Sequence, residues 1–185
     1  LAGMEARAAN VVFVDAHVIV YRGWLEGLLR DIREDYRTVV NPTVSIIDHE
    51  RWAAQPFSKG VGGSVSFDWG MEHHWEGAHM QRDRDSPITM GQFATSRRWF
   101  VESGGFDLGM VDWGCENIDM GVKTWLCGGR VKVSHDSVVS HAFRNADNRP
   151  PYTVKPGAVC LNKVRLAEVW LDEQLKQRFY DAVNR

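Results

Sequence analysis

Hydrophobic positions along the chain alternate between short apolar runs and helical stripes. Val11 to Val14 form a continuous apolar run rich in β-branched residues, which predicts a strand covered on both faces, as in a parallel sheet. From Trp24 to Ile32 the apolar residues follow helical spacing and the charged residues lie on the other face. A strand, a turn and an amphipathic helix therefore follow one another, which indicates an alternating α/β organisation.

The same patterns continue through the rest of the chain. Strand is predicted over 38–40 and 44–47, interrupted at Asn41-Pro42 because proline cannot donate to a central ladder. Apolar and polar residues alternate with period two from Phe67 to Trp75, which predicts one extended segment. The remaining expectations are helices over 97–103, 116–127 and 164–183, a strand running from 131 toward 139, and a proline-rich loop over 145–157.

Composition narrows the class of protein. The 185 residues are 44% hydrophobic and 25% charged, which suits one globular domain with a sizeable core. The net charge of -2 gives no electrostatic reason to expect nucleic acid or an anionic membrane as partner. No apolar run approaches the roughly 18 residues of a membrane span. The 3 cysteines form no CxxC pair and predict neither a disulfide framework nor a zinc site.

Candidate chemistry begins where the first apolar run ends, at Asp15-Ala16-His17. Residues i and i+2 of a strand point to the same face, so Asp15 and His17 can offer an oxygen and a nitrogen to one ion. Such a mixed set suits Mn²⁺, and Mg²⁺ less well. His141 is a third candidate because it also follows an apolar strand run. The alternative is that Asp15 caps a turn and both histidines are ordinary packed side chains.

A second candidate group is Asp112-Trp113-Gly114-Cys115-Glu116-Asn117, which places an aromatic ring, a turn and an acid ahead of a helix. Trp113 could offer an apolar face to a sugar while Glu116 accepts hydrogen bonds from its hydroxyls. The alternative is structural, since an acid at a helix N-terminus is favoured by the helix dipole and a glycine permits the turn.

The two candidate groups belong to a longer series of segments. The series is Asp15-Ala16-His17, Gly23-Trp24-Leu25-Glu26, Arg37-Thr38-Val39-Val40, Trp113-Gly114-Cys115-Glu116-Asn117, Cys127-Gly128-Gly129, His141-Ala142-Phe143-Arg144, Pro151-Tyr152 and 167–173. In order and spacing, over nearly the whole chain, these segments resemble the catalytic domain of polypeptide N-acetylgalactosaminyltransferases.

The resemblance implies a GT-A type α/β fold with a mixed central sheet flanked by helices. It implies Mn²⁺, a UDP-GalNAc donor, and transfer of GalNAc with retention to Ser or Thr hydroxyls of a polypeptide acceptor. By motif position, Asp15, His17 and His141 would be the metal ligands, with Asp15 and Glu116 the catalytic pair. Contacts to donor or acceptor would come from Trp113, Asn117, Arg144, Tyr152, Trp69 and Gly91.

The resemblance also carries expectations about organisation. Residues 1–185 would be a partial GT-A domain whose uridine-binding part precedes Leu1, with a mobile active-site loop over 145–160 and a C-terminal helical segment over 162–185. No lectin domain is expected in this sequence. Since Leu1 is not an initiator methionine, we expect the chain to start inside a longer protein. A Golgi location is implied by the resemblance alone.

Several positions depart from the family pattern. Cys115 replaces the second glycine of Trp-Gly-Gly-Glu-Asn and narrows the space beside the sugar. Met90-Gly91-Gln92-Phe93 lacks a glycine pair that approaches the donor sugar, and Asp136 stands where a family cysteine usually pairs, so at least one customary disulfide is expected to be absent. The donor is therefore less firmly predicted than the metal site. A galactosyltransferase or other UDP-sugar transferase, and a non-catalytic binding module, remain the alternatives.

Overall fold

The computed structural model of the protein describes residues 2–48, 50–54, 64–75, 85–144 and 153–184. The strands are β1 Asn10–Phe13, β2 Val18–Val20, β3 Thr38–Asp48, β4 Ala53–Ala54, β5 Val65–Phe67, β6 His73–Trp75, β7 Phe93–Ser96 and β8 Arg130–His141. The helices are α1 Ala2–Glu5, α2 Trp24–Glu34, α3 Arg97–Glu102, α4 Glu116–Leu126, α5 Ala158–Trp170 and α6 Glu173–Val183. None of the helices in this described part combines the length and apolar character that a membrane crossing requires.

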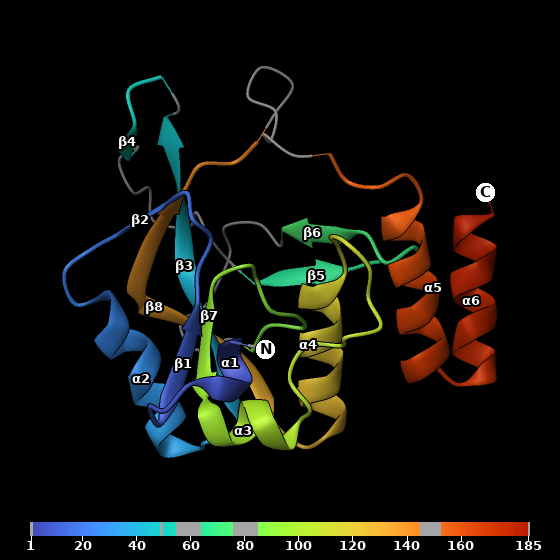
Figure 1. The fold of residues 1–185 in the computed structure, drawn as a ribbon, viewed down its shortest axis with the longest axis horizontal. Helices are drawn as coiled ribbons and strands as arrows, with labels where there is room; N and C mark the ends of the chain where they lie inside the picture. Colours follow the sequence, from blue (N-terminus) through green and yellow to red (C-terminus); the bar gives the residue numbers. More distant parts are fainter. Residues whose placement is uncertain (1, 49, 55–63, 76–84, 145–152, 185) are drawn as a thin grey trace.

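The main sheet is six-stranded and mixed, with the order β1-β7-β3-β8-β2 and β4 added to β3 (Figure 1). Only the central pair β3 and β8 is parallel. Helix α2 packs through Leu28 and Ile32 on the face that presents Val40, whereas α3 and α4 cover the face that presents Val39. Because neighbouring strand residues point to opposite faces, β3 is covered on both sides, as the predicted mixed α/β fold requires.

The first apolar run forms an edge strand of the sheet. Strand β1 lies at one edge of the sheet and pairs antiparallel with β7. Only Val11 of this strand is buried, and Val14 beyond its end is exposed. The predicted parallel setting was wrong, because β1 pairs antiparallel at the sheet edge. Both faces of the strand nevertheless contact apolar clusters, since Phe13 packs on the α3 side and Val12 on the α2 side.

The predicted break at Asn41-Pro42 was also wrong, since β3 runs through both residues. Pairing of β3 with β7 ends at Val40, and the register with β8 shifts between Pro42 and Thr43, where Ser134 and Val138 are the successive partners. A bulge in β8 thus lies where the proline cannot donate, so the strand tolerates it without a break.

The alternating segment from Phe67 to Trp75 is divided into a hairpin rather than one extended strand. Asp68 turns the chain, because its Oδ1 accepts from the backbone N–H of Gly70 at 2.8 Å and of Glu72 at 3.0 Å. Met71 lies in this turn with φ 55° and is nevertheless buried. The apolar side chain of the turn therefore anchors the hairpin to the core.

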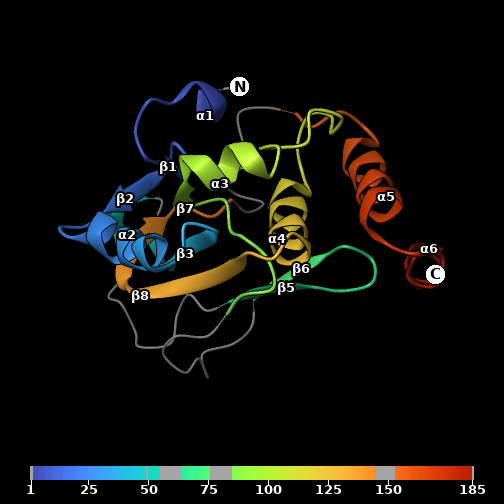
Figure 2. The ribbon, with the colours of Figure 1, turned by 90° about the horizontal axis from the view of Figure 1, so that it is seen from below.

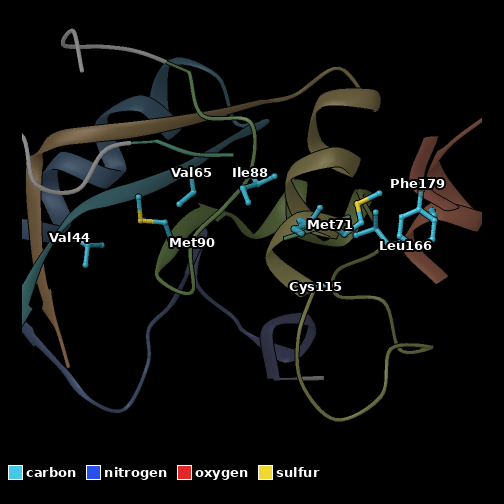
Figure 3. Packing of buried hydrophobic residues seen from close by; sticks show 10 residues of the cluster. Val44, Val65, Met71, Ile88, Met90, Cys115, Leu166 and Phe179 are labelled. Atoms are coloured by element: carbon cyan, nitrogen blue, oxygen red, sulfur yellow. The ribbon is translucent and has the colours of Figure 1, made fainter. Parts of the chain in front are cut away.

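At the C-terminal end, α5 and α6 lie side by side beyond α4 and the β5–β6 hairpin, as both ribbon views show (Figure 1 and Figure 2). The helical pattern over 164–183 is divided at Leu171-Asp172, and Asp172 caps α6 by accepting from the Leu175 N–H at 2.9 Å. Leu166 of α5 and Phe179 of α6 join a core cluster that extends through Cys115 and Met71 to Val44 of β3 (Figure 3). This cluster connects the helical pair to the sheet.

We expect the Phe179→Ala substitution to lower the free energy of unfolding by about 3–5 kcal/mol, because it deletes a large, fully buried side chain and leaves a cavity. Leu108→Ala, at a position that is 80% exposed, is the control and should change the stability by less than about 0.5 kcal/mol. Urea denaturation followed by circular dichroism measures both values. Equal effects of the two substitutions would contradict the packing of α6 against this core.

Candidate metal centre

Asp15, His17 and His141 come together at the ends of three strands. Asp15 follows β1, His17 precedes β2, and His141 is the last residue of β8. Strand pairing places Val18 opposite His141, and the Ala142 N–H donates to the His17 carbonyl at 3.1 Å. One donor atom from each of the three side chains lies within 4.8 Å of the other two. The structure therefore brings together the three residues that the sequence singled out as candidate ligands.

The local geometry is compatible with a divalent cation. His141 Nε2 lies 3.1 Å from Asp15 Oδ2, and the rings of His17 and His141 are 4.6 Å apart between centroids. His141 Nδ1 is buried and has no hydrogen-bond partner among the described residues, so the ring is not fully committed to internal bonds. One carboxylate and two imidazoles form a mixed donor set that fits Mn²⁺.

The charges around the triad also favour a cation. The hydrogen bond from His141 lowers the pKa of Asp15 below its usual value, although partial burial opposes the shift. Burial lowers the pKa of His17, and the nearby charge of His141 adds to this effect. Asp15 is thus ionised and His17 neutral over a wider range of acidic pH, which are the protonation states that ligate a metal ion.

Two neighbours hold Asp15 in place. Gln92 Nε2 donates to Asp15 Oδ2 at 2.5 Å, and a Cβ added at Gly91 would lie 2.9 Å from the same oxygen. Gly91, predicted as a substrate contact, thus lies directly against a candidate metal ligand. The role of Gln92 was missed by the sequence reasoning, which noted this residue only as a departure from the family pattern.

A cavity of about 300 Å³ adjoins the triad and is lined by Asp15 and His141. Trp113, Glu116 and Asn117 line the same cavity from the N-terminal end of α4 and the turn before it. The sequence-predicted residues of these two separate segments therefore face one space. Gly91 lines this cavity as well.

Cys115 is the N-cap of α4 and also lines the cavity. It adopts φ 71°, in the left-handed region where glycine is favoured, and its side chain is buried. Burial raises the pKa of the Cys115 thiol to about 11. The thiol is consequently neutral near pH 7 and narrows the cavity without supplying a nucleophile.

Two further lining residues, Phe143 and Lys163, were not predicted as contacts. Phe143 packs at 4.4 Å between ring centroids against His141 and at 5.8 Å against Trp75 of β6, so the hairpin closes one side of the cavity. Lys163 of α5 also lines it and forms an ion pair with Glu72. No local spacing links these residues in the sequence, because they come from three distant elements.

Among the described residues, two predicted contact residues do not line the cavity. Trp69 lies in the hairpin turn, where the Arg178 guanidinium lies 5.2 Å from its ring centroid. Arg144 is not a lining residue, but its charge contributes to the lowered pKa of His17, which places it near the triad. Tyr152 lies outside the described residues, as does the 145–152 part of the predicted mobile loop.

Comparison with known proteins addresses the family. No family model matches the chain. The chain is 39% identical over 175 residues to a Caenorhabditis elegans protein named probable N-acetylgalactosaminyltransferase 8, an alignment that covers 88% of this chain and 40% of that protein. It is 36% identical over 194 residues to human polypeptide N-acetylgalactosaminyltransferase 6, covering 97% of this chain and 30% of that protein. The chain belongs to the polypeptide N-acetylgalactosaminyltransferase family.

The solved structures agree with this family and with the predicted GT-A fold. A crystal structure of GalNAc-T7 with UDP, GalNAc and Mn²⁺ matches with a TM-score of 0.81 at 25% identity, covering 99% of this chain and 36% of that chain. The chain therefore spans well under half the length of these GalNAc-transferase relatives. All 3 cysteines are free. Asp136, where the family pattern led us to expect a cysteine, forms a 2.6 Å ion pair with Arg30.

Asp15→Asn and His17→Ala should each weaken Mn²⁺ binding by more than the roughly 10- to 100-fold loss that is typical of outer-shell substitutions, because each removes a ligand. Electron paramagnetic resonance titration of free Mn²⁺ measures this effect without any substrate. His74→Ala is the control, since His74 is exposed and pairs with Asp68 in the hairpin. Unchanged Mn²⁺ affinity in the first two variants would contradict the assignment of the centre.

Gly91→Ala should reduce Mn²⁺ affinity by roughly 10-fold, because the added methyl displaces the end of the Asp15 side chain. The free energy of unfolding should change by less than about 0.5 kcal/mol, since a flexible side chain can move aside. Gly70→Ala is a matched control, because its Cβ would lie 3.3 Å from another aspartate oxygen, that of Asp68, outside the triad. The same Mn²⁺ titration and a urea melt separate the two effects.

Proposed function

We propose that this chain is part of the catalytic domain of a retaining, Mn²⁺-dependent transferase that moves GalNAc from UDP-GalNAc to Ser or Thr hydroxyls of polypeptides. The observation that carries the proposal is the convergence of Asp15, His17 and His141 beside a cavity that Glu116 also lines. Two further facts support it: the names of the curated relatives, and the UDP, GalNAc and Mn²⁺ in the GalNAc-T7 crystal structure.

In this proposal, Asp15, His17 and His141 hold the Mn²⁺. When bound, the ion supplies Lewis acidity that neutralises charge building on the diphosphate of the leaving UDP. Gln92 fixes the Asp15 carboxylate through its hydrogen bond, so the ligand oxygen does not have to be ordered when the donor arrives. Strand ends emerging from a buried sheet give the two histidines comparable rigidity.

The cavity would receive the transferred sugar. Trp113 would offer its ring to an apolar face of the sugar, while Glu116 and Asn117 would hydrogen-bond its hydroxyls. The negative charge of Glu116 in the first turn of α4 is stabilised by the helix dipole, which keeps this carboxylate available as an acceptor.

The remaining contacts stay proposals that follow from motif position. Arg144 and Tyr152 would close over the nucleotide, Gly91 would approach the donor, and Trp69 would lie toward the acceptor polypeptide. Trp69 contacts the Arg178 guanidinium of α6 and is still 44% exposed, so part of its ring stays open to an acceptor. A Golgi location is proposed on family membership alone.

A second candidate is transfer from another UDP-sugar, for example UDP-galactose. The observation in its favour is Cys115, whose buried side chain occupies cavity wall where the family pattern has glycine. A narrower cavity would disfavour the N-acetyl group of GalNAc. The third candidate, a non-catalytic binding module, gains no support from the assembled triad.

The decisive experiment supplies the full-length protein with Mn²⁺, a Ser/Thr peptide and UDP-GalNAc, UDP-galactose or UDP-glucose, and follows sugar incorporation by mass spectrometry. Incorporation of GalNAc that stops when the metal is chelated is the expected result. Faster transfer of galactose or glucose would overturn the proposed donor in favour of the second candidate. Nucleotide binding without transfer or hydrolysis of any donor would overturn the enzyme and favour the binding module.

Glu116→Gln should lower the kcat of sugar transfer by roughly 10- to 100-fold, because the hydrogen bonds of a charged acceptor to the sugar are weakened. Mn²⁺ affinity should not change, since Glu116 is not in the triad. Glu173→Gln is the matched control, because Glu173 also lies in the first turn of a helix but is exposed on α6. Steady-state kinetics with the preferred donor measures the difference, and equal kcat in the two variants would exclude a catalytic role for Glu116.

A further inference from the structure

A buried amide interrupts the apolar stripe of α5. Ala158, Asn162 and Leu166 follow one another at four-residue spacing on the buried side of the helix, and Asn162 is only 1% exposed. A polar side chain at such a position must find hydrogen-bond partners, because burying an unpaired amide is costly. Within the described residues, the hydrogen-bond partners of Asn162 lie in one short turn of another part of the chain.

That turn precedes α4 and carries Trp113. Asn162 Nδ2 donates to the carbonyl oxygens of Val111 at 2.9 Å and Trp113 at 3.3 Å. It also donates to the carbonyl of Gly114 at 2.9 Å. In return, Asn162 Oδ1 accepts from the Val111 N–H at 2.8 Å. One side chain therefore uses both its donor and its acceptor on consecutive parts of the same turn.

The turn has a conformation that needs such support. Asp112, Gly114 and Cys115 adopt positive φ values of 58°, 104° and 71°, and two of these residues carry a Cβ that disfavours this region. Trp113 between them is 52% exposed, so its own packing does not fix the backbone. The hydrogen bonds of Asn162 offset the cost of this backbone, which leads directly into Glu116.

The same face of α5 also contacts the turn through apolar atoms. A Cβ added at Gly114 would lie 3.3 Å from Val159 Cγ2, so the turn packs closely on the helix. Asp112 adds a separate contact by accepting from the Lys155 N–H at 2.6 Å just before α5. The N-terminal half of α5 thus supports the turn through apolar packing by Val159 and through the hydrogen bonds of Asn162.

We propose that Asn162 is a positioning residue, which holds the 111–115 turn so that Trp113 and Glu116 face the cavity beside the metal centre. Its effect on catalysis rests on the proposed function, whereas its effect on the turn does not. Asn162 touches neither the triad nor the cavity, and it acts only through the backbone of the turn.

The test compares Asn162→Asp and Asn162→Ala with Asn184→Asp at the exposed end of α6, all in the full-length protein. Asn162→Asp keeps the shape and the acceptor but removes the donors and places carboxylate oxygen against three carbonyls. We expect hydrogen exchange of the 111–116 amides to accelerate at least 10-fold in both Asn162 variants, with β3 amides unchanged. Mn²⁺ affinity should stay at the wild-type value while kcat falls at least 10-fold.

Each other outcome overturns the proposal. If the 111–116 amides of the Asn162 variants exchange at the same rate as in the Asn184→Asp control, the turn does not depend on Asn162. Acceleration across the whole chain, or loss of folding in both variants, would show a global structural role in place of local positioning. Altered exchange with wild-type kcat would remove the link to catalysis. If the wild-type protein transfers no sugar, the proposed function fails on its own, and the exchange data still decide whether Asn162 holds the turn.

Discussion

The candidate metal centre depends on how the short link between β1 and β2 closes one end of the sheet. These strands are the two ends of the order β1-β7-β3-β8-β2, and residues 14–17 alone connect them. Four flat strand spacings of about 4.8 Å would span roughly 19 Å, whereas the chain from Phe13 to Val18 reaches at most about 18 Å. The sheet must therefore curl at this end. Asp15 and His17 are carried on that link, so the curl that closes the sheet also brings them to His141.

The second half of the site is built on helix ends. Glu116 and Asn117 begin α4, and the turn before them rests on α5 through Asn162. Helix α4 is itself joined to α5, because the Trp170 Nε1–H donates to the buried Asp119 carboxylate at 2.7 Å. The same carboxylate pairs with the buried Lys123 ammonium at 3.2 Å. Sheet and helices thus contribute separate halves of the site. The core cluster that contains both Val44 of β3 and Phe179 of α6 packs the two halves against each other.

The two halves suit different tasks in a sugar transfer. The triad presents one carboxylate and two imidazoles, held by strand pairing and by Gln92. The cavity wall presents an exposed tryptophan and a carboxylate, which are adapted to a polar ligand with apolar faces. Cys115 occupies a position whose φ favours glycine and contributes its thiol to the same wall. Donor choice is therefore the property most sensitive to local change, because it depends on side-chain volume in this cavity rather than on the fold.

The sequence by itself determined the local elements and the types of residue at the site. Helical stripes predicted α2 and α4 closely, and the polar residues at the ends of apolar runs singled out Asp15, His17 and His141. The sequence did not predict that β1 is an edge strand or that β3 continues through Pro42. Both features depend on which strands pair with β1 and β3 in the folded sheet. The sequence did not single out Gln92, Lys163 or Asn162, whose partners lie far away in the chain. Periodicity reports what a residue's own element buries, whereas these contacts exist only once the sheet has curled and α5 has packed against α4.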